Sequence, residues 1–402
     1  MVADLAAHWP LYLAIPFVAA LIGYVTKRVA IEMMFRPLEF AGIRPFLGWQ
    51  GVVPKHGGRM AAIATDLLTS NLLDLKEIFA RIDPDRLTAT MEQPLLRAVD
   101  EIARDVLAEY QPRLWEALPP MAQELVVKQL QAAAPRIVRE LMADLRENLD
   151  DVLDVNHMTV QHLTRDKALL VRLIRETTRP EMAFIARCGI YFGFGLGVVQ
   201  AFVWALTKNP WVLPIFGGCI GLLTDWLAIK MIFLPREPVR VLPGLILHGK
   251  FQRRRHEVSR QYGELVAHEV LTTPNLVDAL LRGPRADQMV SIVRRTVAKA
   301  VDEQAGRLIS VTIGAARLRE MKAAAANHAV ARLRETVRHA EGYLTDAMDV
   351  ANMVEQRMLA LTPVQYEGLL RPAFRQEEWK LISVGGVIGF VVGELQVLLM
   401  LH

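Results

Sequence analysis

An internal repeat constrains this chain more than any other feature of its sequence. When the sequence is shifted by 198 residues, the segment 23–37 falls on 221–235, with Gly23 on Gly221 and a proline at the end of each copy. At a shift of 196 residues, the segments 189–200 and 385–396 both read Gly-x-x-x-Gly-x-x-x-Gly-x-x-Gln. Such self-similarity indicates two copies of one structural unit, in residues 1–207 and 208–402.

Each copy begins and ends with an apolar segment. Apolar residues make up 52% of the chain and the mean hydropathy is +0.23, which fits a protein that is partly in lipid and partly in water. A helix of about 20 apolar residues crosses the hydrocarbon core of a bilayer. We therefore predict four membrane helices, although the two shorter segments would also suit the core of a soluble protein. The segments are 11–25, 183–206, 211–223 and 381–401, and the first and third are expected to continue as helix to Phe35 and Phe233.

The distribution of basic residues predicts the topology. No Lys or Arg precedes the first apolar segment, whereas Lys27 and Arg28 follow it, which is the reverse of a secretory signal and typical of a retained anchor. The other basic residues near the membrane ends belong mainly to the two long loops. The positive-inside rule then places both large domains in the cytoplasm and both termini outside, in a multi-pass protein.

The predicted fold is an all-α integral membrane protein. It has two tandem parallel repeats, each with two transmembrane helices that bracket a cytoplasmic helical domain. The repeats are parallel because an even number of spans returns the chain to its starting side. The long loops show helical spacing of apolar residues, which we interpret as packing surfaces rather than a ligand channel. The predicted domains are a first membrane helix at 1–35, a first interfacial collar and helical cytoplasmic domain at 36–182, a transmembrane hairpin at 183–233, a second collar and helical domain at 234–380, and a closing membrane helix at 381–402.

The glycine stripes predict where helices meet. A glycine every four residues clears one face of a helix, so that two backbones can approach closely in lipid. We expect the two closing helices to pack together and their glutamines to bond across the seam. The alternative is that each stripe packs on a neighbouring helix of its own half. The residues concerned are Gly193, Gly197, Gln200, Gly389, Gly393 and Gln396.

Charged residues at equivalent positions of the opening helices are swapped between the halves. Lys27 is equivalent to Asp225, and Glu32 is equivalent to Lys230. If these helices cross near the repeat axis, each pair can neutralise itself, as charges near hydrocarbon must; otherwise each is solvated separately at the interface. Glu394, inside the last span, is a further candidate, although a bond to a neighbouring helix would explain it.

The segments that follow the opening helices are apolar, rich in proline and glycine, and end in basic residues. Such segments suit the headgroup region, where apolar side chains enter the bilayer and Lys or Arg meets anionic lipid. A structural collar that joins span to domain is the alternative interpretation. The candidate lipid-interface residues are Arg44, Trp49, Lys55, Lys250, Arg253, Arg254 and Arg255.

No motif predicts catalysis, a cofactor or a metal. The ten histidines are scattered, and none of the zinc-protease, serine-hydrolase or phosphate-loop patterns occurs. The two cysteines lie within apolar runs, which favours buried thiols over a disulfide or zinc site. The Arg253–His256 run is basic, but the adjoining membrane segment favours lipid over nucleic acid.

The repeated motifs resemble a bacterial membrane family known as domain of unknown function 445, or uncharacterised protein family 0754. Gln50-Gly51-Val-Val-Pro54-Lys55 and Thr224-Asp225-Trp226-Leu-Ala228-Ile229 are similar to its two repeated patterns. The first half departs from the family pattern, with Lys27-Arg28 in place of Asn-Trp. The resemblance implies a location in the bacterial inner membrane, and it implies no activity because the family has no assigned chemistry.

Three functional hypotheses follow. The first is a non-enzymatic protein whose cytoplasmic domains organise lipid or protein partners at the inner membrane. The second is a carrier of lipid or another amphiphile, and the third is a membrane-bound enzyme of unknown chemistry. An apolar cavity beside Trp49 or Leu245 would favour the carrier, whereas a filled core with a broad exposed apolar face would favour the organising role. Membrane lipids, including anionic ones, are the expected partners, and a homo-oligomer or a protein partner is compatible with either role.

Overall fold

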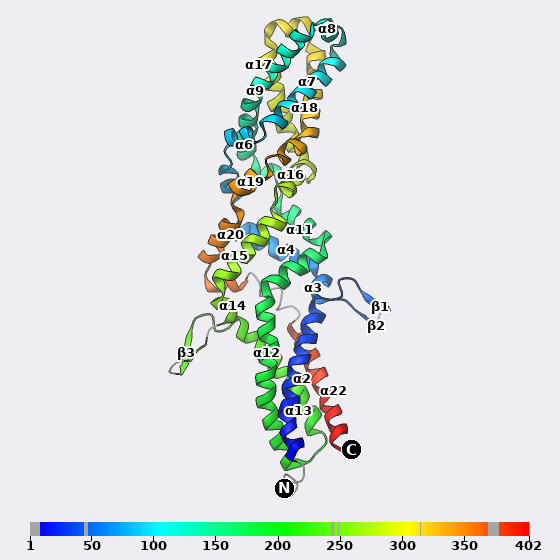
Figure 1. Cartoon of the computed structure of the whole chain (residues 1–402), viewed down its shortest axis with the longest axis vertical. Helices are drawn as coiled ribbons and strands as arrows, with labels where there is room; N and C mark the ends of the chain where they lie inside the picture. Colours follow the sequence, from blue (N-terminus) through cyan, green and yellow to red (C-terminus); the bar gives the residue numbers. More distant parts are fainter. Residues whose placement is uncertain are drawn as a thin grey trace. The chain divides into compact units, whose positions relative to one another are not determined.

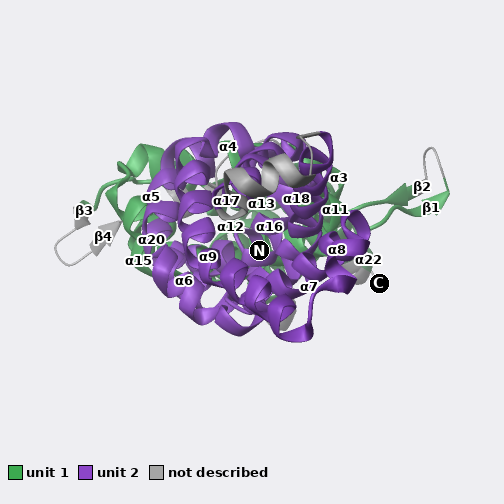
Figure 2. Ribbon diagram, turned by 90° about the horizontal axis from the view of Figure 1, so that it is seen from above, with its two compact units in different colours: residues 1–67, 162–262, 355–402 green, residues 68–161, 263–354 purple. Residues whose placement is uncertain are grey.

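The computed structural model describes residues 9–43, 47–242, 245–247, 249–313, 315–368 and 378–401. Helices make up almost all of this part of the chain, which confirms the all-α prediction (Figure 1). The chain divides into two compact units that each draw on both halves of the sequence (Figure 2). Unit 1 comprises residues 1–67, 162–262 and 355–402, and unit 2 comprises residues 68–161 and 263–354.

Four long helices form the centre of unit 1. They are α2 (Trp9–Phe35), α12 (Lys167–Thr207), α13 (Val212–Phe233) and α22 (Glu378–Leu401). The first and third end where the sequence predicts, at Phe35 and Phe233. Helix α12 is longer than predicted, because it continues through Pro180 without a break. It ends at Lys208, which adopts a left-handed conformation with φ of 48°.

The glycine stripes pack on helices of their own half. Helix α12 lies along α2, and α22 lies along α13. Gly189 faces Gly23 so closely that a Cβ atom on either would overlap the other's carbonyl, and Gly389 faces Gly217 in the same way. The prediction that the closing helices pack together is therefore wrong. The opening helix offers the small partner residues that a glycine stripe needs for backbone contact.

The four-helix bundle buries several polar side chains among apolar ones and exposes large apolar side chains on its outer surface. Lys27, Gln200 and Asp225 are buried, whereas Phe17 and Phe202 are 60% and 64% exposed. This arrangement is the reverse of a water-soluble bundle and suits a hydrocarbon environment. Among the described residues, two helical segments are long and apolar enough to cross a membrane, Leu13–Phe35 and Lys167–Thr207. The apolar segments of α13 and α22, Val212–Ala228 and Ile382–Leu398, are shorter.

Two short hairpins follow the opening helices, and the sequence analysis did not predict them. Strands β1 (Ala41–Ile43) and β2 (Leu47–Trp49) pair antiparallel, as do β3 (Val239–Leu242) and β4 (Leu245–Leu247). The signal for the second hairpin was β-branched and leucine residues on either side of Pro243-Gly244, a typical turn dipeptide.

The two hairpins are anchored by the same backbone bond. The amide of Gly51 donates to the carbonyl of Pro37, and that of Gly249 donates to Pro235, both at 2.9 Å. Shorter helices complete unit 1 after each hairpin. They are α3 (Val52–Lys55), α4 (Gly57–Leu67), α14 (Lys250–Arg253) and α15 (Arg255–Leu265), with the last residues of α11 (Val155–Arg165) and of α20 (Val350–Ala360).

Unit 2 is a single helical body to which both long loops contribute. The predicted division into two helical domains, within 36–182 and 234–380, does not describe it, because helices from the two loops pack on each other. Helix α7 (Glu92–Tyr110) packs on α18 (Ala315–Arg338), and α9 (Pro120–Glu147) packs on α17 (Ala286–Ile313). Each loop alone presents an amphipathic helix pair whose apolar face needs a partner, and the other loop supplies one. Two π-helical turns, η1 (Leu68–Leu72) and η2 (Val266–Val270), begin the two contributions.

Some helices of unit 2 start at conventional capping residues. The side chain of Asp74 caps α5, that of Asp83 caps α6 and that of Thr272 caps α16. The helices from the first half are α5 (Leu75–Ala80), α6 (Pro84–Thr90), α7 (Glu92–Tyr110), α8 (Pro112–Ala117), α9 (Pro120–Glu147) and α10 (Leu149–Val152). Those from the second half are α16 (Thr273–Arg282), α17 (Ala286–Ile313), α18 (Ala315–Arg338) and α19 (Glu341–Met348).

The glycine crossing of α2 and α12 generates a testable prediction. Replacing Gly189 with leucine should lower the free energy of unfolding by at least about 1–3 kcal/mol, because the new side chain meets backbone that cannot move aside. The midpoint of thermal unfolding in detergent measures the effect. Gly195→Leu is the control, because that position of the same helix faces open space. Equal effects of the two substitutions would contradict the crossing.

Candidate functional site

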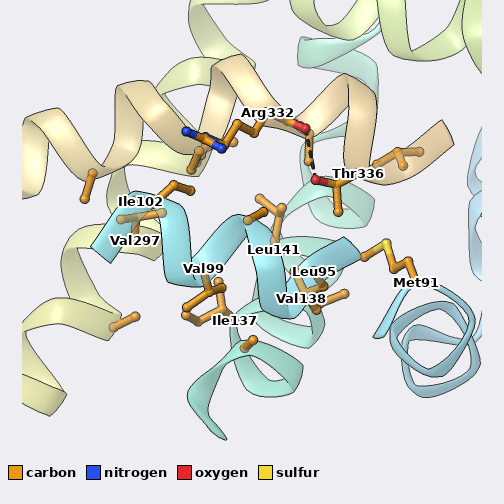
Figure 3. Close-up of a pocket in the computed structure, with 18 of the residues that line it drawn as sticks. Met91, Leu95, Val99, Ile102, Ile137, Val138, Leu141, Val297, Arg332 and Thr336 are labelled. Atoms are coloured by element: carbon orange, nitrogen blue, oxygen red, sulfur yellow. Dashed lines mark hydrogen bonds between the residues drawn. The ribbon is translucent and has the colours of Figure 1, made fainter. Parts of the chain in front are cut away.

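A large apolar cavity lies inside unit 2. Its volume is about 480 Å³, within the range of roughly 300–1,000 Å³ that is usual for small-molecule sites. Helices α7 and α9 from the first half and α16, α17 and α18 from the second half form most of its wall. Figure 3 shows how side chains of α7 and α9 point toward it. The cavity exists only because both halves build one body.

Aliphatic side chains line the cavity almost entirely. On α7 they follow helical spacing, at Leu95, Val99 and Ile102, and α9 contributes Ile137 and Leu141 (Figure 3). These five side chains are only half-buried although they face the interior. Apolar surface that faces inward without being covered is what an apolar ligand would bury. The apolar side chains of α9, which follow the helical spacing that predicts a packing surface, are thus partly the wall of a cavity.

One charged side chain borders the cavity, that of Arg332 on α18. Its guanidinium forms ion pairs with Glu101 and, at 3.1 Å, with Asp105. Thr336, one turn later, donates its hydroxyl to the Arg332 carbonyl. The charge of Arg332 is therefore already neutralised, and no other described side chain of the lining is charged.

The composition of the wall limits what the cavity can do. In the described part of the chain, its lining includes no His, Cys, Ser, Asp or Glu side chain, and its polar side chains are those of Gln129, Thr273, Arg332 and Thr336. Among the described residues, no three His, Cys, Asp or Glu side chains converge as they would around a metal ion. The site suits an uncharged aliphatic chain. All its lining residues belong to unit 2, whereas Trp49 and Leu245, where the carrier hypothesis expected a cavity, belong to unit 1.

A second site, which is polar, lies in the interior of the four-helix bundle. Lys27 Nζ is 2.9 Å from Asp225 Oδ1 and donates to Thr224 Oγ1 at 2.7 Å. Lys27 is 1% exposed, so neither charge can be solvated by water instead. The predicted pairing of Lys27 with Asp225 is present, and it joins α2 to α13. Gly385 makes room for it, since a Cβ atom there would overlap the Asp225 carboxylate.

The glutamines also meet. Gln200 Nε2 lies 3.5 Å from Gln396 Oε1 and 3.4 Å from the carbonyl oxygen of Leu213. The predicted bond is thus present, although the glycine stripes of the same helices pack elsewhere. A small void of about 20 Å³ separates the glutamines from Thr26 and Thr224, large enough for about one water molecule.

The second predicted charge pair does not form. Glu32 binds Arg175 at 2.8 Å, and Lys230 is exposed, with its ammonium 4.0 Å from the centre of the Trp226 ring. Both charges lie nearer the ends of their helices, where solvent or a neighbouring helix is available. Glu394 is exposed and makes no bond across the bundle among the described residues.

The structure sorts the predicted lipid-interface residues into two groups. Arg254 binds Glu181 at 2.6 Å and Glu257 at 2.8 Å, and these contacts raise its pKa above the usual value, Glu257 contributing most. Arg255 donates to the carbonyls of Met358 and Leu359 at the end of α20. Both arginines are therefore internal contacts, which corrects the prediction.

Other members of that set remain accessible. Lys55 and Arg253 are exposed, and Lys250 is half-buried. The Trp49 ring nitrogen donates to the Met33 carbonyl at 3.0 Å, so this side chain ties the first hairpin to α2. Arg44 lies outside the described residues.

Comparisons with known proteins agree with the resemblance that the repeated motifs indicate. The family described as "Protein of unknown function (DUF445)" matches residues 215–340. The chain is 23% identical to a UPF0754 membrane protein of Synechococcus sp. (strain JA-3-3Ab), over 98% of this chain and 100% of that protein. A UPF0754 membrane protein of Microcystis aeruginosa is 21% identical over 96% of each chain.

A match over a shorter segment has a higher sequence identity. A UPF0754 membrane protein of Synechococcus elongatus is 31% identical over 36% of this chain and 34% of its own length. No solved structure matches the chain. Together the matches confirm the resemblance to an uncharacterised bacterial family whose members are named as membrane proteins.

The buried ion pair generates a prediction. Lys27→Met and Asp225→Leu should each destabilise the protein by about 3–5 kcal/mol, because each leaves one charge buried without a partner. The double variant should recover most of this loss, since no charge then remains. Thermal unfolding of the detergent-solubilised protein measures it, with Arg28→Met as the exposed neighbouring control. A double variant as unstable as the sum of the two single variants would show that the pair is not coupled.

Proposed function

We propose that this chain is a multi-pass inner-membrane protein that binds the hydrocarbon part of a lipid or similar amphiphile in unit 2 and carries it to or from the bilayer. The observation that carries the proposal is the cavity of about 480 Å³ with an almost wholly aliphatic wall. A bundle core without a ligand is normally filled to close packing. Five half-buried aliphatic side chains around one void are therefore better explained by a guest molecule.

The chemistry of the wall supports an aliphatic, uncharged guest segment. Branched and linear aliphatic residues dominate, and the one charged side chain, Arg332, is neutralised by Glu101 and Asp105. A free carboxylate placed there would meet no unpaired cation. The polar headgroup of an amphiphile would accordingly remain outside the cavity, and the proposed role is non-enzymatic.

The membrane arrangement is part of the same proposal. All four long helices cross the bilayer as two tandem parallel repeats, and both long loops lie on the cytoplasmic side. The matching glycine crossings and the matching hairpin bonds of Gly51 and Gly249 support the repeat. One body that contains helices from both loops supports the proposal that the loops emerge on the same side of the membrane. The basic residues near the membrane ends support the cytoplasmic side.

The organising role is the second candidate. Hairpin residues Ile43 and Val239 are 78% and 48% exposed, so they can enter a membrane surface or meet a protein partner. An unfilled cavity is not needed for that role. The two functions therefore differ in whether a ligand occupies unit 2.

Occupancy of the cavity can be tested with matched variants on α9. Leu141→Trp should fill the cavity and reduce the amount of lipid that copurifies with the protein by at least about tenfold, because the guest loses its space. Native mass spectrometry and lipid extraction of the detergent-solubilised full chain measure the bound lipid. Leu125→Trp is the control, because Leu125 lies on the same helix but is 63% exposed.

The outcomes separate the candidates. Loss of bound lipid in Leu141→Trp alone supports carriage. Wild-type protein without any bound apolar molecule, or equal retention in both variants, would contradict the cavity proposal and leave the organising role as the better one.

The topology can be tested by cysteine labelling. In a protein whose Cys188 and Cys219 are replaced by alanine, Asn209→Cys should react with a membrane-impermeant maleimide in intact spheroplasts. Leu114→Cys and Arg319→Cys, one from each long loop, should react only after lysis, because the proposal places both loops inside. Labelling of only one of these two before lysis would contradict the parallel arrangement.

A further inference from the structure

Two cations at the start of the apolar part of α12 have no carboxylate partner. Lys250, the first residue of α14, and Arg187 on α12 make no ion pair within the part of the chain that the structure describes. Arg254, four residues after Lys250, is by contrast paired with Glu181 at 2.6 Å. Lys250 and Arg187 are therefore cations that no described carboxylate neutralises.

The fold holds these cations next to each other. On α12, Phe184 lies three residues after Glu181 and Arg187 lies three residues after Phe184, so Phe184 is next to each of them on the helix surface. Arg254 of the α14–α15 junction binds Glu181, and Lys250, four residues earlier, lies with its ammonium 4.5 Å from the centre of the Phe184 ring. Arg187 follows Phe184 by about one turn of α12. The ammonium of Lys250 thus lies over the phenyl ring of Phe184, about one helical turn from the residue that carries the guanidinium.

Placing these charges together is unfavourable without a counter-ion. The pKa of Lys250 lies below its usual value, mainly because the ammonium is partly buried and next because of the positive charge of Arg187. Glu181 opposes this shift, but its carboxylate is already bound by Arg254. The group of Arg187, Lys250, Arg254, Glu181 and Glu257 therefore carries a net charge of about +1 and would be stabilised by an anion.

The position of the group indicates where the anion comes from. Immediately beyond Arg187, the face of α12 becomes apolar and exposed, with Ile190 at 40% and Tyr191 at 73%. Aromatic side chains such as tyrosine are typical of the boundary between headgroups and hydrocarbon. An anion beside Arg187 would thus lie at the level of lipid phosphates, with acyl chains along Ile190 and Tyr191.

We propose that Lys250 and Arg187 form a binding site for the phosphate of an anionic membrane lipid. The ammonium and the guanidinium each donate to phosphate oxygens, and Phe184 holds the Lys250 side chain in place. Arg254, whose charge is balanced by Glu181 and Glu257, does not contact the lipid. This site lies in unit 1 and is separate from the cavity of unit 2.

The cations of this site have no basic counterparts at the equivalent positions of the other copy of the repeat. The residue equivalent to Lys250 in the first half is Val52, and it is buried. The residue equivalent to Arg187 in the second half is Ser383. If these positions had only a structural role in the repeat, both copies would be expected to carry similar residues. Cations occur in one copy alone.

The test uses the full chain in detergent, titrated with dioleoyl-phosphatidylglycerol or dioleoyl-phosphatidylcholine and followed by native mass spectrometry. Lys250→Gln and Arg187→Gln should each weaken phosphatidylglycerol binding by about fivefold, because each removes one cation near the headgroup. Binding of phosphatidylcholine should change little. Lys250→Arg should retain the affinity, and Arg253→Gln, an exposed neighbour, is the matched control.

Several results would overturn the proposal. They are an unchanged preference for phosphatidylglycerol in both Gln variants, or an equal loss in Arg253→Gln, which would indicate a general effect of surface charge. Full displacement of phosphatidylglycerol by excess inorganic phosphate would identify a site for free phosphate instead of a lipid. Thermal unfolding of each variant excludes a folding defect as the cause. Leu141→Trp should leave this selectivity intact, so the two lipid proposals can fail independently.

Discussion

Helices α2 and α12 approach each other so closely at Gly23 and Gly189 that neither position has room for a Cβ atom, and α13 and α22 do the same at Gly217 and Gly389. In lipid the hydrophobic effect does not drive helices together, so such backbone contact is a main source of association. These two crossings make two helix pairs. Every other feature of the bundle, including its buried polar side chains, depends on how the pairs then face each other.

The ion pair and the glutamine pair join the two helix pairs. Lys27 bonds from α2 to Thr224 and Asp225 on α13, and Gln200 bonds from α12 to Gln396 on α22. Buried polar groups of this kind add little stability compared with apolar side chains, but they disfavour any other register. The glycines therefore allow the two backbones of each helix pair to approach closely, and the polar groups determine how one pair aligns with the other.

Unit 2 follows a different principle from the bundle. Its helices are amphipathic, and the apolar faces of the two loops cover each other, as expected in water. Small residues such as Ala103, Ala133 and Ala134 line much of the interior and leave it unfilled. The same apolar face thus serves both for packing and as the wall of a cavity, which is why helical spacing alone led us to interpret it as packing.

The sequence by itself determined the helical character, the ends of the opening helices at Phe35 and Phe233, and the partners of Lys27 and Gln200. These follow from local pattern and from equivalence between the halves, because a charge or amide near the repeat axis meets its own counterpart. Sequence patterns did not show that the glycine stripes pack within each half, or that Arg254 and Arg255 are internal. Only the tertiary structure decided these contacts, the union of both loops in unit 2 and the cavity within it. The physical reason is that a helical face has the same sequence pattern whether another helix, a void or a lipid covers it.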